Sequence, residues 1–170
     1  HGDVNIYVNN TAINNFCSPQ EDVVKKCYAF GDPMFVNPDV SNPFNWELPN
    51  LTPQNPSVIN AGIHLATTVG SGVGTTLIVT DALCFQDGTW GSALSNRQAD
   101  WIAIGSVDNV VQISSINYST NTITLASSKS WADGAKVWLF KKSDGAQVLY
   151  GPAPDVGAYE TGSTAPAVPV

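Results

Sequence analysis

The sequence predicts an all-β protein, and three features carry this prediction. Apolar residues alternate with polar ones or run continuously for a few positions, and β-branched residues dominate these stretches. Helix signals are nearly absent, since one short charged stretch, Gln20–Tyr28, is the only candidate for a helical turn or two. Asp-Gly pairs, which favour tight turns, stand at 87–88, 133–134 and 144–145.

The first expected elements lie at residues 4–16, where short apolar strands alternate with pairs of Asn. Asn tolerates left-handed backbone conformations and stacks in ladders at repeated corners. This pattern is typical of the rungs of a parallel β-helix, and an isolated antiparallel strand is the alternative. Between residues 32 and 62, prolines bracket very short strands, which indicates edges, turns and caps rather than a central sheet.

From residue 75 to residue 150 the pattern changes to a series of separate short strands. Strands are predicted at 75–80, 101–105, 110–117, 122–126 and 136–140. Because only Ser119–Asn121 separates two of them, residues 110–126 are expected to form a β-hairpin. Five or six antiparallel strands of this length favour a small barrel or sandwich.

Four motifs follow one another in a recognisable order: DPMFVNP at 32–38, FNWEL at 44–48, NPSVINAG at 55–62 and PDVGAYE at 154–160. This order resembles the C-terminal closing region of bacterial secreted right-handed parallel β-helix repeat proteins. Residues 101–139 resemble a β insertion found between the last two motifs, and the resemblance covers roughly residues 1–160. Similar ends occur on polysaccharide lyases, on other glycan-processing proteins and on proteins of no known activity.

The resemblance implies an all-β fold with two components: the terminal rung or rungs of a right-handed parallel β-helix, and an inserted small antiparallel β-barrel or sandwich. The expected parts are a β-helix end with a Pro-rich closing segment at 1–74, the inserted module at 75–150, a returning strand at 151–160 and a flexible tail at 161–170. Asn60 departs from the family pattern, which usually has Asp there. A charge or metal role would be lost, whereas a capping role survives because Asn also accepts hydrogen bonds.

The composition indicates a protein that works outside the cell. Charged residues make up 12% of the chain, about half the usual share, and hydrophobic residues make up 43%. This balance is common in extracellular β proteins, so we expect a secreted, extracellular or cell-surface location. The net charge is −7 without a basic patch, which argues against a nucleic-acid partner. No apolar run approaches the roughly 20 residues that span a bilayer.

The three cysteines favour a disulfide over a metal site. No CxxC pair is present, which argues against structural zinc. Cys17 and Cys27 flank a polar loop that a disulfide would close in an oxidising compartment, with two independent thiols as the alternative. Cys84 lies in an apolar run and is expected to be a small buried residue.

The tryptophans are the best functional lead, because flat aromatic faces stack on sugar rings. Trp90 lies in a Gly-rich loop and Trp131 precedes an Asp-Gly turn, so both are candidate glycan-binding residues. The alternative is that both side chains pack between the inserted module and the end of the β-helix. Trp101 and Trp138 lie within apolar strands and are expected to be core residues.

The sequence contains two candidate metal sites. An N-terminal His followed by Gly occurs in copper enzymes that oxidise polysaccharides, and here His1 would need His64, the only other histidine, as its partner. A fragmentation or tag residue is the alternative for His1. Asp81 or Asp87 would be the calcium ligands, with turn formation as the alternative explanation. No other cofactor is expected.

These observations leave three hypotheses of function. The first is a glycan-associated accessory or capping region of an extracellular β-helix protein, without catalysis of its own and with a polysaccharide as partner. The second is a structural or filament subunit that pairs with copies of itself through an open β-helix rung. The third is a copper-dependent polysaccharide oxidase with an N-terminal His1 brace.

Overall fold

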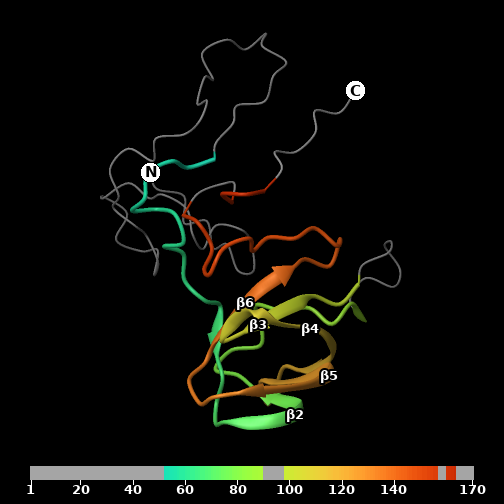
Figure 1. Cartoon of the computed structure of the whole chain (residues 1–170). Coiled ribbons are helices and arrows are strands. Elements are labelled where there is room, and N and C mark those ends of the chain that lie inside the picture. Colours follow the sequence, from blue (N-terminus) through green and yellow to red (C-terminus); the bar gives the residue numbers. More distant parts are fainter. Residues whose placement is uncertain (1–51, 90–97, 157–159, 164–170) are drawn as a thin grey trace, which may run out of the picture. The chain divides into compact units, whose positions relative to one another are not determined.

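The computed structural model describes residues 52–89, 98–156 and 160–163 (Figure 1). The chain divides into two compact units, of which the larger is the continuous segment 64–152. The smaller unit combines the two ends of the chain, residues 1–63 and 153–170.

The larger unit is an antiparallel β-sheet. Its strands are β1 (Ala66–Thr67), β2 (Gly72–Ile78), β3 (Trp101–Ile104), β4 (Ser106–Asn117), β5 (Thr122–Trp131) and β6 (Lys136–Lys141), in the spatial order β1-β6-β3-β4-β5-β2. The residues that the structure describes contain no α-helix, and no helix among them is long and apolar enough to cross a membrane. The all-β prediction is therefore confirmed for this part of the chain. The predicted turns of Gln20–Tyr28 and the Asn-rich rungs lie outside it.

The sheet curls like a barrel that has been opened along one side. Figure 1 shows β2 and β5 on one side of the curl and β3 and β6 on the other. Register shifts interrupt four of the strand pairings, which allows the strands to bend. The two edges approach each other at one end of this opening, where Thr68 after β1 bridges Val79 after β2, beside a hydrogen bond of 2.8 Å from Val69 N to Ile78 O.

Alternating side chains divide between the two faces of the sheet. On β3, Ile102 and Ile104 enter the inner apolar cluster, whereas Ala103 between them belongs to an outer one. The inner cluster receives buried residues from all six strands, together with Phe85 from the segment before β3. Burial of each large aliphatic or aromatic side chain contributes about 1.5–3 kcal/mol, so this cluster is the main source of stability. The outer cluster contains Trp138, which is 5% exposed, as expected for a core residue.

The turns lie where the sequence predicts them. The glycines of the three Asp-Gly pairs, Gly88, Gly134 and Gly145, have φ of 79°, 68° and 85°, a region that favours glycine. β4 and β5 form the predicted hairpin, with Asn117 paired to Thr122 across its end.

Thr68 is a buried polar residue at the closing point of the curl, with 2% of its surface exposed. Its hydroxyl donates to Ala132 O at 2.6 Å and accepts from Ala135 N at 2.9 Å. Its backbone N–H donates to Ala135 O at 2.9 Å, and its carbonyl accepts from Gly134 N at 3.1 Å. These four bonds join the residue after β1 to the turn between β5 and β6.

The smaller unit brings the last two sequence motifs together. Val58 and Val156 are fully buried, and Val156 N donates to Val58 O at 2.8 Å. Gly62 N donates to Pro154 O at 2.7 Å. In the predicted returning strand, Pro154 and Val156 make these backbone bonds to the earlier motif, and residues 151–156 do not form a β-strand.

The hairpin residue Asn121 provides a test of this architecture. It has a φ of 49°, its carbonyl accepts from Val79 N at 3.0 Å, and its side-chain Oδ1 accepts from Ala82 N at 3.0 Å. We expect Asn121→Gly to lower the free energy of unfolding by about 1 kcal/mol, because only the side-chain bond is lost. We expect Asn121→Ala to lower it by about 2 kcal/mol, because alanine also resists the left-handed backbone. Urea unfolding measures both, and equal losses would contradict the conformational part of this explanation.

Candidate functional site

Trp131 is the predicted glycan-binding residue that the structure describes, and it lies at the end of β5. It is half-buried and packs against the inner apolar cluster. Its partner across the sheet is Gly72 of β2. A methyl group at Gly72 would lie 2.9 Å from Cζ2 of the indole, closer than carbon atoms pack. Glycine at this position therefore lets the indole lie directly against the β2 backbone.

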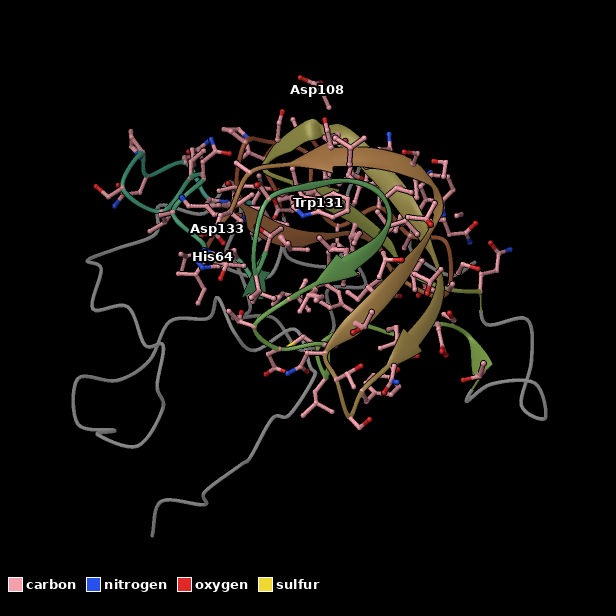
Figure 2. All side chains as sticks on the ribbon, turned by 90° about the horizontal axis from the view of Figure 1, so that it is seen from below. His64, Asp108, Trp131 and Asp133 are labelled. Carbon is pink, nitrogen blue, oxygen red and sulfur yellow. The ribbon has the colours of Figure 1, made fainter. Side chains whose placement is uncertain are left out.

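A shallow, open groove of about 610 Å³ lies beside this indole. Figure 2 shows Trp131 within the curve of the sheet, enclosed on one side by β2. Its lining includes Ser71, Gly72 and Val73 from the β2 segment, Ser130 and Trp131 from β5, and Ala132 from the turn that follows. Val73 is 81% exposed and extends the apolar surface outward. Aromatic and aliphatic surface next to serine residues is the combination that sugars prefer, because one sugar face is apolar and its rim carries hydroxyls.

Asp133 lies next to this groove along the chain, directly after Ala132, which also lines it. Its Oδ1 accepts a hydrogen bond of 2.7 Å from Gly70 N, and Gly70 directly precedes Ser71 of the lining. This bond holds the exposed carboxylate near the groove. Asp108, by contrast, projects outward from the curl and away from Trp131 in Figure 2.

Several other predicted site residues lie outside the described residues: Trp90, His1, Cys17 and Cys27. The proposed disulfide and the histidine pair with His64 therefore stay predictions. His64 itself is described and partly buried, at the start of the larger unit. Within the described ranges, no three His, Cys, Asp or Glu side chains are grouped as a metal site would require.

The predicted calcium candidates Asp81 and Asp87 both accept hydrogen bonds from the backbone. Asp81 Oδ1 accepts from Leu83 N at 2.8 Å, which is a local turn. Asp87 accepts from Thr89 N at 3.1 Å, and its other oxygen accepts from Ile116 N at 3.1 Å. Burial raises the pKa of Asp87, but its hydrogen bonds outweigh burial, so the pKa is lowered overall. The turn explanation accounts for what these carboxylates do here.

Asp100 is more important to the fold than the sequence indicated, because its carboxylate is only 5% exposed. Its Oδ2 accepts from Gln86 N at 2.8 Å, and Asp100 N donates to Gln86 O at 2.9 Å. These bonds anchor the segment that carries Phe85 over the inner cluster. Burial raises the pKa of Asp100 to about 6, helped by the charge of Asp144 and opposed by backbone hydrogen bonds from Gln86 and Ser143.

In the smaller unit, Asp155 connects the two sequence motifs through a carboxylate that is 3% exposed. Its Oδ1 accepts from Asn60 N at 2.7 Å, and its Oδ2 accepts from Thr161 N at 2.5 Å. Asn60 has a φ of 56°, a conformation that Asn and Asp tolerate best among side-chain-bearing residues. Because the backbone N–H of residue 60 makes this bond, the bond does not depend on whether the side chain at this position is Asn or Asp.

Glu160 completes this cluster of buried polar groups. Its Oε1 accepts a hydrogen bond of 3.0 Å from Asp155 N. Burial raises the pKa of Glu160 to about 8, with a further contribution from the negative charge of Asp155. Asp155 and Glu160 of the PDVGAYE motif thus both act as hydrogen-bond acceptors for the backbone.

No protein-family model, no curated protein and no solved structure matches this chain. The resemblance to β-helix closing regions therefore remains a hypothesis.

The raised pKa of Asp100 predicts a pH dependence of stability. A pKa of about 6 in the folded protein, against 3.8 for the free group, means that the folded state binds the proton more tightly. Stability from this group is therefore greatest below pH 3.8 and falls as the pH rises to about 6, by up to ~3 kcal/mol. Asp100→Asn keeps an acceptor for Gln86 N and is expected to remove this fall. At neutral pH its free energy of unfolding should equal or exceed that of the wild type.

Urea unfolding from pH 4 to pH 7.5 measures this effect. The matched control is Asp108→Asn, which removes the same charge from an exposed side chain. The explanation would be contradicted if Asp100→Asn and Asp108→Asn changed the pH profile equally.

Proposed function

We propose that the chain is a glycan-associated accessory or capping region of an extracellular β-helix protein, without catalysis of its own. In this proposal, a sugar ring stacks beside Trp131 in the groove formed by β2 and β5. The sequence motifs support the β-helix part of the proposal, and the groove supports the glycan part.

The observation that carries the glycan part is the way Trp131 is held. Gly72 lies against one side of the indole, and the inner apolar cluster packs against it as well. The side chain nevertheless lines an open groove. A ligand that stacks on an aromatic ring already held in place loses less conformational entropy than one that must order it.

The contact between the last two motifs supports the capping part. An exposed end of a β-helix would present unpaired N–H and C=O groups and would invite aggregation. A cap needs a segment that is folded back on itself with its polar groups satisfied. The Asp155 carboxylate does this between Asn60 and Thr161, because it pairs two backbone N–H groups in a buried position.

The filament and copper hypotheses depend on the N-terminal segment, residues 1–51, which lies outside the described residues. Both remain hypotheses.

Substitution of Trp131 tests the proposed glycan site. The probe is a set of neutral hexasaccharides (cellohexaose, laminarihexaose and mannohexaose), with binding followed by saturation-transfer NMR and titration calorimetry. We expect Trp131→Ala to weaken binding at least ~10-fold and Trp131→Phe to weaken it about two- to four-fold, because phenylalanine keeps a smaller stacking face.

Two controls separate binding from folding. Tyr150→Ala removes an exposed aromatic ring that does not line the groove, and it should leave binding unchanged. Urea unfolding of each variant identifies any loss due to instability, since Trp131 also packs against the core. Trp90→Ala tests the second predicted residue in the same way. If the folded Trp131→Phe and Trp131→Ala variants bind every probe as the wild type does, the proposed site is wrong.

A further inference from the structure

The charges around the Trp131 groove indicate which class of glycan it accepts. We propose that the groove selects neutral sugars and excludes polyanionic ones such as polyuronates, with the Asp133 carboxylate as the group at its rim that sets this preference. This inference rests on the proposed glycan function and adds the class of ligand.

The lining itself is the first support. Every described residue that lines the groove is uncharged, and its polar members are serines and backbone groups of glycine. A polyuronate carries one carboxylate on each sugar, and recognition of a carboxylate normally uses an arginine or lysine that forms charged hydrogen bonds. A groove built from an indole, aliphatic groups and hydroxyls instead matches a ring with neutral hydroxyls.

The position of Asp133 is the second support. Gly70 N holds this carboxylate at 2.7 Å, next to two lining positions of the groove, Ser71 and Ala132. A carboxylate accepts hydrogen bonds but donates none, so it pairs well with a sugar hydroxyl and repels a sugar carboxylate. The net charge of −7 adds a field of the same sign.

The lysines of the described part are the third support, because contacts elsewhere engage three of them. Lys142 Nζ pairs with Asp144 at 3.3 Å. Lys136 lies 6.0 Å from the ring centre of Trp138, and Lys141 lies 5.7 Å from that of Trp101. Lys136 directly follows the lining residue Ala135, but its contact with Trp138 places it beside the outer cluster, whereas Ala135 packs against the inner one.

Lys129 is the lysine closest in sequence to Trp131, two residues earlier on β5, and it is not among the lining residues. It therefore provides an internal check. If an anionic glycan bound here, Lys129 would be the residue expected to hold it.

The test compares two ligands of equal length, a neutral hexasaccharide that binds the wild type and hexagalacturonate, by titration calorimetry of the full chain. At ~20 mM salt we expect the neutral ligand to bind at least ~10-fold more tightly. At ~500 mM salt the ratio of the two affinities should fall, because salt screens the repulsion of the anionic ligand. Asp133→Asn keeps the acceptor for Gly70 N. It should lower the ratio of neutral-ligand to anionic-ligand affinity at low salt about two- to five-fold.

Control variants make the outcomes distinct. Lys129→Gln and Asp108→Asn should each leave the preference within about two-fold of the wild type. Hexagalacturonate binding as tight as the neutral ligand, and lost in Trp131→Phe, would overturn this inference while leaving the glycan function intact. An unchanged preference in Asp133→Asn would also overturn it. If neither hexagalacturonate nor any of the three neutral hexasaccharides bound the wild type, the proposed function itself would be overturned and the inference with it.

Discussion

The hydroxyl of Thr68 is bonded on both sides at the place where the sheet closes on itself. β1 and β2 are the two edges of the sheet, and a curled sheet with free edges would expose unpaired backbone groups. Backbone bonds from Val69 N to Ile78 O and from Thr80 N to Thr67 O join the two edges. The buried hydroxyl of Thr68 ties the same segment to the turn between β5 and β6, because it accepts from Ala135 N and donates to Ala132 O. A valine of the same shape would fill the space but would make neither hydroxyl bond, so the tie between the closing segment and the turn depends on a polar atom in an apolar setting.

The candidate site follows from this closure. The turn held by Thr68 contains Ala132 and Ala135, and both residues line the groove next to Trp131. The same turn carries Asp133, whose carboxylate binds Gly70 two residues after Thr68. One closing interaction therefore sets the position of the indole, of the rim carboxylate and of the β2 backbone together. A binding site at the point of closure gains rigidity without further cost, which favours weak ligands such as single sugar rings.

The sequence predicts the strands of the larger unit well, because a half-buried strand has a period of two that is local and visible. The hairpin of β4 and β5 and the turn glycines could be predicted from neighbouring residues alone. β5 extends to Trp131, beyond the predicted end at residue 126, because its polar run of serines and lysine hides the alternation. The bonds of Thr68, Asp100 and Asp155 could not be predicted, since their partners lie 64, 14 and 95 residues away. For the same reason the sequence identified Trp131 as a candidate but not the glycine that positions it.

The role of the Thr68 hydroxyl is tested most directly by the free energy of unfolding of Thr68→Val, with Thr68→Ser as the matched variant that keeps the hydroxyl. We expect a loss of about 2–3 kcal/mol for Thr68→Val and a clearly smaller loss for Thr68→Ser, because only valine leaves Ala132 O and Ala135 N with no bond but the 3.4 Å one between them. Hydrogen exchange should show the Ala135 amide losing protection in Thr68→Val before the amide of Ile123 does. A loss below ~0.5 kcal/mol for Thr68→Val, or equal losses for the two variants, would contradict the claim that this hydroxyl holds the closing segment to the turn between β5 and β6.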